Sequence, residues 1–272
     1  MKQRIKNFSG ILEKLNCDSF LVSDPDNIAY LTGFRLTQGY LLVEASGKML
    51  CFTNFLYSQI VKSIACWQVI VSSAKNNIFD LIAGEVSKLK HKRVGFEAKK
   101  MPFLEYKTLK ILLLKKNINF IGESDVIEKI RMIKTKKEIS FIKKSILVSK
   151  EAFKFAKEIA DSDMTEKDLS IEVEKFLRLK GDNEIAFETI VASGKNTVFP
   201  HHLSSDCKLD RNFFLIDLGS KYYGYCADLT RMLIWGKMPT LFTKIYATVR
   251  KAQELSIKKI KDGVKASEVD RA

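Results

Sequence analysis

The sequence has few of the residues that build disulfide-held or thiolate-held scaffolds. Five cysteines occur among 272 residues, and no two of them form a C-x-x-C pair. An odd, scattered set argues against both a disulfide framework and a thiolate zinc site, so reduced thiols are expected. The five positions are Cys17, Cys51, Cys66, Cys207 and Cys226.

Long apolar runs are also missing, and the existing runs are short enough to be strands. No segment is long enough to span a bilayer, so no membrane partner is expected. At the amino terminus, charged residues interrupt residues 1–8 where a signal peptide needs an unbroken apolar segment. We therefore expect a cytoplasmic protein.

Arginine is scarce for a chain with a net charge of +14. Nine arginines accompany 37 lysines, and arginine is the residue that recognises phosphates and guanines in forked geometry. The lysines are spread along helix-like segments such as 134–157 and are not gathered with aromatic residues. We therefore expect no nucleic-acid partner. The alternative, a basic nucleic-acid-associated protein, would show strongly salt-dependent binding.

The first part of the chain alternates strand-like and helix-like patterns, which is typical of an α/β domain. Helices are predicted at about 55–65, 77–89 and 103–115, and the strands Val69–Val71 and Val94–Phe96 are predicted between them. The polar stretch Gly122–Asp125 is the natural boundary. We predict a domain over 1–122, a linker over 123–134 and a second domain over 135–272.

The second part opens with two helix-start signals. Thr135–Glu138 and Thr165–Asp168 are capping-box patterns, each followed by apolar residues at helical period. Gly181 stands where a left-handed residue would end the second helix. The remaining predicted elements are a strand over Phe187–Val191, a hairpin over Phe213–Trp235 and a helix over about 242–261.

Two aspartates in that hairpin carry the chemical hypothesis. Asp217 interrupts an apolar strand, where a carboxylate is costly unless it is paired or bound to metal. Asp228 follows 11 residues later, so a hairpin centred between Tyr222 and Tyr223 places the two directly opposite, with Cβ atoms roughly 5 Å apart. Such carboxylates repel each other unless cations lie between them, and two metal ions about 3.5–4 Å apart suit that gap. Turn and edge residues are the alternative interpretation.

Several motifs together resemble the Xaa-Pro aminopeptidase and prolidase family of pita-bread metallopeptidases. A V-x-S-G-x-N…H pattern lies in Ile190–His202, L-I-D-x-G in Leu215–Gly219, and G-Y-x-x-D-x-T-R in Gly224–Arg231. Asn27–Phe34 resembles the signature of a creatinase-type amino-terminal domain, and Ile130–Ile139 resembles the junction. The resemblance covers the whole chain. It implies a creatinase-type α/β amino-terminal domain followed by an incomplete α+β pita-bread catalytic domain.

The resemblance also implies a two-metal site and a substrate. In such enzymes two Asp, one His and two Glu hold two divalent ions, commonly Mn²⁺, with Zn²⁺ or Co²⁺ as alternatives. Asp217 would ligate one ion and Asp228 both. His201 would hydrogen-bond the peptide or the developing oxyanion, with a plain loop histidine as the alternative. The expected partner is a proline-containing peptide, and homo-oligomer formation is left open.

Other residues of these motifs are implied to surround the site. His202 would line the pocket. Tyr225, Thr230 and Arg231 would orient or support the aspartates, and packing or surface ion pairing is the alternative for each.

One departure from the family pattern bears on activity. The third ligand, a histidine, and both glutamates lie beyond the aspartates in the family, yet the three histidines here are His91, His201 and His202. Two carboxylates alone should hold a divalent ion weakly. We therefore expect an Xaa-Pro aminopeptidase by ancestry that is cut short, inactive in this form and only partly folded in its second domain. Apolar residues Leu215, Leu233 and Trp235 are expected to be exposed there. A dipeptidase (prolidase) and a non-catalytic pita-bread module that binds peptides or proteins are the alternatives.

Overall fold

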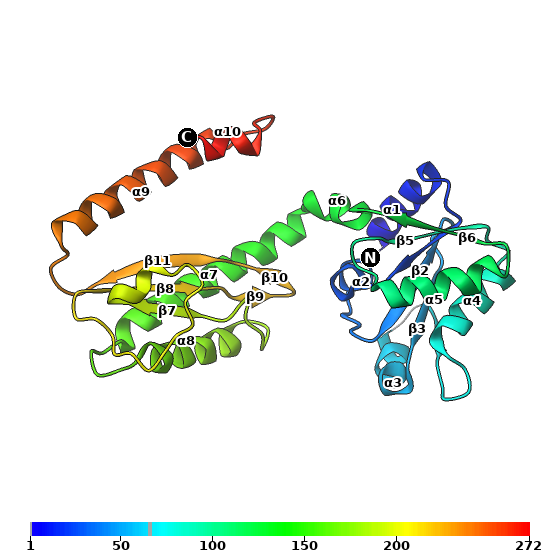
Figure 1. The fold of residues 1–272 in the computed structure, drawn as a ribbon, viewed down its shortest axis with the longest axis horizontal. Coiled ribbons are helices and arrows are strands. Elements are labelled where there is room, and N and C mark those ends of the chain that lie inside the picture. Colours follow the sequence, from blue (N-terminus) through cyan, green and yellow to red (C-terminus); the bar gives the residue numbers. More distant parts are fainter. Residues whose placement is uncertain (1, 65–66) are drawn as a thin grey trace. The chain divides into compact units, whose positions relative to one another are not determined.

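The computed structural model describes residues 2–64 and 67–272, so the prediction for Cys66 lies outside the described residues. The chain divides into two compact units, Met1–Lys134 and Thr135–Ala272. Figure 1 shows a sheet with helices in each unit. Among the described residues, no helix is both long and apolar enough to cross a membrane.

The amino-terminal unit is built on a six-stranded mixed sheet with the order β4-β3-β2-β1-β5-β6. β1 runs parallel to β5 and antiparallel to β2. The strands are β1 (Ser19–Val22), β2 (Gly39–Glu44), β3 (Met49–Thr53), β4 (Gln68–Val71), β5 (Arg93–Glu97) and β6 (Asn119–Glu123). The helices are α1 (Lys2–Lys14), α2 (Pro25–Thr32), α3 (Phe55–Ile64), α4 (Ile78–Lys88), α5 (Phe103–Leu114) and α6 (Val126–Met132).

Helices cover both faces of this sheet, because successive residues of its strands point to opposite sides. Phe20 and Val22 of β1 pack in a core with α1, α2, α3 and α6. Leu21, between them, packs in a second core with α4 and α5. The segment 123–134, predicted to be a linker, contains α6, which buries Val126 and Ile127 in the first of these cores. The three-layer arrangement is the α/β domain that the alternating pattern predicts.

The carboxyl-terminal unit packs two long helices against a three-stranded antiparallel sheet with the order β11-β8-β7. Both capping boxes predicted from the sequence are present, at Thr135 and at Thr165. The helices are α7 (Lys136–Ile159), α8 (Glu166–Lys180), α9 (Thr240–Lys259) and α10 (Ala266–Asp270), with the 3-10 helix η1 (Gly194–Val198). The strands are β7 (Ile190–Ser193), β8 (Phe213–Leu218), β9 (Lys221–Tyr222), β10 (Tyr225–Cys226) and β11 (Leu229–Ile234).

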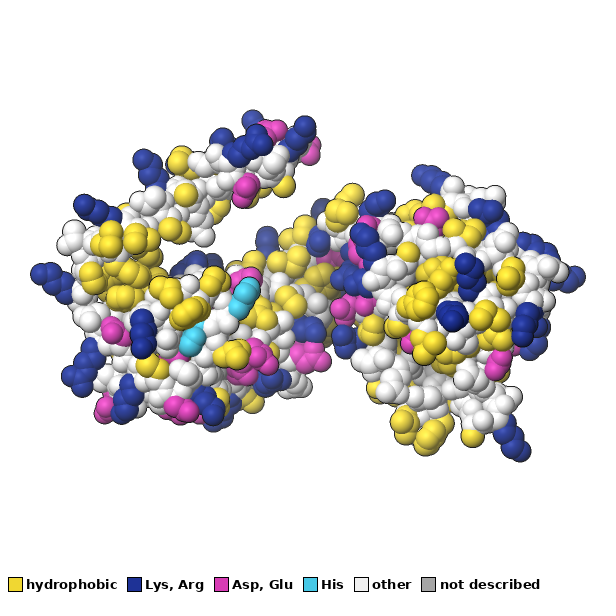
Figure 2. All heavy atoms as spheres, viewed as in Figure 1, with side chains coloured by type: hydrophobic (Ala, Val, Ile, Leu, Met, Phe, Trp, Pro, Cys, Tyr) yellow, Lys and Arg dark blue, Asp and Glu magenta, His cyan; other side chains and the backbone are white. Residues whose placement is uncertain are grey.

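One face of this sheet forms the core of the unit. Phe214, Ile216 and Leu218 of β8 are fully buried against α7 and α8. The alternate residues of β8, among them Leu215 and Asp217, face the other side and are half-buried. Helix α9 buries no residue, and Figure 2 shows apolar side chains exposed near its beginning.

Two details differ from the sequence prediction. Gly181 ends α8 with a φ of −99° rather than in the left-handed region. A glycine suits this position for another reason, because a Cβ there would lie 2.7 Å from the carbonyl oxygen of Lys221. Leu233, expected to be exposed, is only 4% exposed because it points into the core between the helices and the sheet.

Candidate active site

The two predicted metal-binding aspartates lie at the same end of the β8–β11 pair. Their predicted direct opposition is wrong, because the Cα partner of Asp217 is Thr230. The turn is centred one residue later than expected, with Tyr222 pairing Tyr225. Asp228 therefore precedes the partner of Asp217 by two residues, which makes the aspartates diagonal neighbours on one face of the sheet.

The diagonal arrangement still brings the two carboxyl groups together. The pKa of Asp228 is raised above its ordinary value by partial burial, by the negative charge of Asp217 and by a hydrogen bond between the two carboxyls. Two acidic groups in contact disfavour simultaneous ionisation. A divalent cation would relieve this repulsion, and carboxylate oxygens are the ligands that hard cations such as Mn²⁺ prefer. The pair therefore fits part of a divalent metal site.

The residues predicted to support the aspartates have different surroundings. The hydroxyl of Thr230 donates a 2.7 Å hydrogen bond to Oδ1 of Asp217, so it does hold that carboxylate. Arg231 donates from Nη1 to the carbonyl oxygen of Thr230 at 2.8 Å. Tyr225 donates from its hydroxyl to Oε1 of Glu138 at 2.7 Å, which ties β10 to the capping box that begins α7.

The two adjacent histidines occupy different environments in the segment after η1. His201 is exposed. His202 is only 13% exposed, and its Nε2 lies 2.7 Å from Oε2 of Glu166. His202 thus faces a buried carboxylate of α8, a contact that the sequence interpretation did not foresee.

Glu166 itself was missed as a functional candidate. It stands in the first turn of α8, inside the Thr165–Asp168 capping pattern, where acidic residues are ordinarily exposed and interact with the helix dipole. The structure buries it completely, at 0% exposure. Nothing in the local pattern distinguishes it from an exposed helix-start residue, because its partners lie 27 to 39 positions away.

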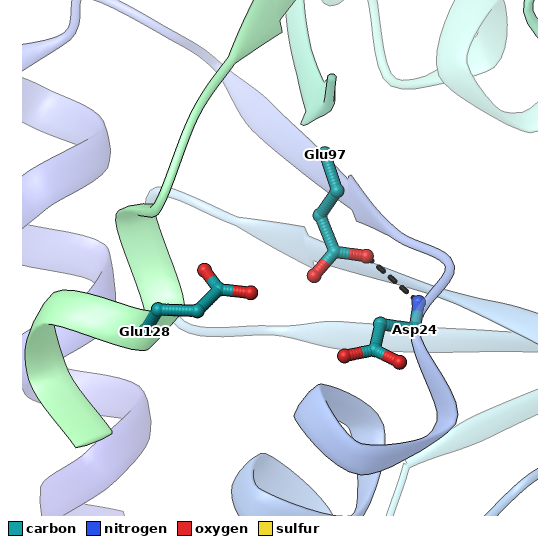
Figure 3. Close-up of side chains that lie close together, drawn as sticks. All are labelled: Asp24, Glu97 and Glu128. Carbon is teal, nitrogen blue, oxygen red and sulfur yellow. Dashed lines mark hydrogen bonds between the residues drawn. The ribbon is translucent and has the colours of Figure 1, made fainter. Parts of the chain in front are cut away.

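A separate group of three carboxylates lies in the amino-terminal unit, and Figure 3 shows Asp24, Glu97 and Glu128 turned toward one another. Their ligand atoms lie within 4.8 Å. However, Oε2 of Glu97 accepts hydrogen bonds from the backbone N–H groups of Ser23 and Asp24, at 2.6 and 2.8 Å.

The rest of this group is also partnered. Asn27 donates from Nδ2 to Oε1 of both Glu97 and Glu128, at 2.6 and 2.8 Å, and Nζ of Lys100 lies 3.5 Å from Oδ2 of Asp24. These contacts describe a hydrogen-bonded cap at the start of α2. The cluster lies in a different unit from Asp217 and Asp228.

Comparison with known proteins agrees with this division into two units. Residues 140–272 match the model of "Metallopeptidase family M24", and residues 4–133 match that of "Creatinase/Prolidase N-terminal domain". An Xaa-Pro dipeptidase of Pyrococcus furiosus is 28% identical over 273 residues, covering 99% of this chain and 75% of that protein.

Solved structures show the same fold. An Xaa-Pro dipeptidase from Bacillus anthracis superposes with a TM-score of 0.89 at 27% identity, covering 99% of this chain and 75% of the other. An X-Pro aminopeptidase from Thermotoga maritima MSB8 gives a TM-score of 0.84 at 28% identity, covering 95% and 74%. The chain thus spans about three quarters of the length of each of these relatives.

These two matched regions, with the aspartate pair in the second, identify the class as a two-unit metallopeptidase. The chain belongs to the pita-bread metallopeptidases that carry a creatinase-type amino-terminal domain.

Proposed function

We propose that the carboxyl-terminal unit carries the two-aspartate portion of an Xaa-Pro aminopeptidase centre that takes two divalent ions, Mn²⁺ first among them. The observation that carries this proposal is the register that makes Asp217 and Asp228 diagonal neighbours on one sheet face, with Thr230 bonded to Asp217. When bound, divalent ions supply Lewis-acid activation of the scissile carbonyl and of water.

The remaining roles are assigned to the chain's own side chains. His201, exposed in the loop after η1, would hydrogen-bond the peptide or the oxyanion that develops at the scissile carbonyl. Thr230 would hold the Asp217 carboxylate in orientation, as groups that bond metal ligands do. An Xaa-Pro dipeptidase is the second candidate, because both dipeptidases and an aminopeptidase are among the similar proteins.

Divalent-ion binding tests this proposal directly. The 272-residue chain should bind Mn²⁺ weakly in a calorimetric titration at pH 7. Both Asp217→Asn and Asp228→Asn should weaken that binding by at least about tenfold, or ~1.4 kcal/mol. Asp206→Asn removes an exposed carboxylate of the same unit and is the matched control. Equal affinity in all four proteins would show that the aspartate pair is not the site.

Turnover gives a second, independent result. With Mn²⁺ added, the 272-residue chain should not hydrolyse a Gly-Pro-type tripeptide, because no histidine follows Asp228 and a two-metal centre needs its full coordination fixed by the protein. The measurement is release of free glycine. Turnover that disappears in Asp228→Ala would refute this expectation.

A fusion that adds the last quarter of a related peptidase would then separate the candidates. Cleavage of tripeptides favours the aminopeptidase, and cleavage of dipeptides alone favours the dipeptidase. Peptide binding without turnover in the fusion would favour a non-catalytic module.

A further inference from the structure

The start of α8 is the anchor for the segment that carries His201. Both oxygens of the buried Glu166 carboxylate accept hydrogen bonds, and all five donors belong to residues 193–205. Oε1 accepts from the backbone N–H of Ser193 at 2.7 Å and from Nδ2 of Asn196 at 2.9 Å. Oε2 is bonded to Nε2 of His202 at 2.7 Å, and to the backbone N–H and the hydroxyl of Ser205 at 3.1 and 2.7 Å.

Backbone contacts fasten the far end of the same segment. The N–H of Glu166 donates to the carbonyl oxygen of Cys207 at 2.9 Å, and the N–H of Lys167 donates to that of Ser205 at 3.1 Å. The segment is therefore held at its beginning, in its middle and at its end by one helix start. Its irregular part contains η1 and the two histidines.

These hydrogen bonds favour the charged form of the buried Glu166 carboxylate. Burial alone raises the pKa of Glu166, but the hydrogen bonds from Asn196, His202, Ser205 and Ser193 outweigh it and hold the pKa below its ordinary value. The carboxylate is therefore ionised at neutral pH. An ionised acceptor requires a proton on Nε2 of His202, which fixes the ring and its tautomer.

We propose that Glu166 is a positioning residue, which orients His201 toward a peptide by holding its neighbour His202 and both flanks of the segment. The role of His201 rests on the proposed function, whereas the anchoring itself rests only on the contacts above. A carboxylate is required because an amide has one acceptor oxygen, and its NH₂ group would face donors on one side. Glutamine therefore keeps the shape of the side chain and the bonds to one oxygen, and loses the bonds to the other.

The chain has three histidines, so each imidazole signal can be followed separately by NMR spectroscopy. Imidazole ¹⁵N spectra of histidine-labelled protein should show His202 as the hydrogen-bonded Nε2–H tautomer. In Glu166→Gln the signals of both His202 and His201 should move. His91 lies in the other unit, where its Nδ1 contacts Ser19, so its signal is the internal reference. Glu172→Gln removes a carboxylate of the same helix that contacts Lys175, and it should leave all three signals in place.

Two results in the free protein would overturn the proposal. One is an unchanged His202 signal in Glu166→Gln, and the other is a His202 shift without any change at His201. Glu166→Ala removes every acceptor and should give the larger displacement. If that variant does not fold, Glu166→Gln carries the test, with spectra recorded well below its melting temperature.

Titration with the dipeptide Gly-Pro separates this inference from the proposed function. In the natural sequence His201 should shift on titration, and in Glu166→Gln the response should weaken by about an order of magnitude, because misplacing a contacting group is costly. An equal response in both proteins would overturn the positioning role. A third outcome is that the His201 signal does not shift with Gly-Pro in either protein, although the His201 and His202 signals differ between the free natural protein and free Glu166→Gln. That outcome would refute the substrate role of His201 and support the positioning of the segment by Glu166.

Discussion

Replacing Phe214 with alanine should lower the free energy of unfolding of the carboxyl-terminal unit by about 3–5 kcal/mol. The Phe214 ring is 0% exposed and belongs to the core formed with α7 and α8. It also contacts Trp235 at a centroid distance of 4.8 Å. Removing the ring leaves a cavity beneath the strand that carries Asp217, so the carboxyl-terminal unit should unfold at a lower denaturant concentration.

The two tryptophans let each unit be followed separately, because Trp67 lies in the amino-terminal unit and Trp235 in the other. In a Trp67→Phe background, the denaturant midpoint of Trp235 fluorescence should fall in Phe214→Ala. In a Trp235→Phe background, the midpoint of Trp67 should stay unchanged.

Two control variants test whether the effect of Phe214→Ala is specific to its buried ring and to its unit. Phe213→Ala removes the adjacent, half-buried ring on the opposite face, which contacts Phe242 at 4.1 Å, and should cost less. Phe52→Ala, in the core of the amino-terminal unit, should give the reciprocal pattern. A coupled loss of both signals in every variant would mean that the two units unfold as one. Absence of any cooperative Trp235 transition in the unmodified chain would instead support the sequence expectation of a partly folded second domain.

The starts of α7 and α8 could be predicted from local signals, unlike α6, which lies in the segment predicted to be a linker. Thr135 and Thr165 begin α7 and α8 because each side chain accepts the N–H three residues on, while the acidic residue at that position bonds back. These contacts span three positions, so the sequence pattern contains all the information they need.

The register of the aspartate hairpin could not be predicted in the same way. The turn places Tyr223 and Gly224 at positive φ, 49° and 77°. Asparagine or aspartate is the usual residue before glycine in such turns, and a tyrosine at positive φ is uncommon. The predicted centre between the two tyrosines came only from the midpoint of the aspartate spacing, although Tyr-Tyr is not a favoured turn pair and a bulge could alter the register. The observed turn moves the partner of Asp217 to Thr230, although the aspartates remain neighbours along the diagonal.

The environment of Glu166 depends on contacts that are distant in sequence. Its donors run from Ser193 to Ser205 and are brought to it by the packing of β7 beside α8. The capping pattern accounts for the helix start but says nothing about which first-turn carboxylate turns inward. The same limit applies to Glu97, whose donors Ser23, Asp24 and Asn27 lie more than 60 positions away.

Glu97→Leu should lower the free energy of unfolding of the amino-terminal unit by about 3 kcal/mol or more, since each orphaned buried donor costs roughly 1–3 kcal/mol. Glu97 is 5% exposed, and its carboxylate takes the two backbone N–H groups at the start of α2 and the amide of Asn27. Leucine has a similar volume and cannot accept any of them. The Trp67 signal in the Trp235→Phe background is the measurement, and Glu13→Leu, at an exposed position on α1, is the control for the substitution itself.

Glu97→Gln should behave differently from Glu97→Leu, and the difference should depend on pH. Burial raises the pKa of Glu97 more than the hydrogen bonds from Asp24, Asn27 and Ser23 lower it. A carboxyl whose pKa is raised on folding stabilises the unit below its unfolded pKa, about 4.3. That contribution is lost as pH rises through the higher folded value.

Glutamine does not titrate, so Glu97→Gln should not lose stability through this side chain as the pH rises. Its amide oxygen keeps an acceptor for the N–H groups at the start of α2, whereas its NH₂ group takes the place of Oε1 and loses the bond from Nδ2 of Asn27, a cost that does not depend on pH. The charges facing this position are Asp24 and Glu128, with Lys100 beside Asp24 and Arg131 bonded to Asn27. Glutamine removes one of three adjoining negative charges, so Glu97→Gln should gain stability relative to the natural protein as pH rises from 4 to 8.

Denaturation at several pH values measures this, with Glu13→Gln as the control. Parallel stability curves for the natural protein and Glu97→Gln would mean that the pKa of Glu97 does not change on folding, and would contradict the raised pKa from which this prediction starts.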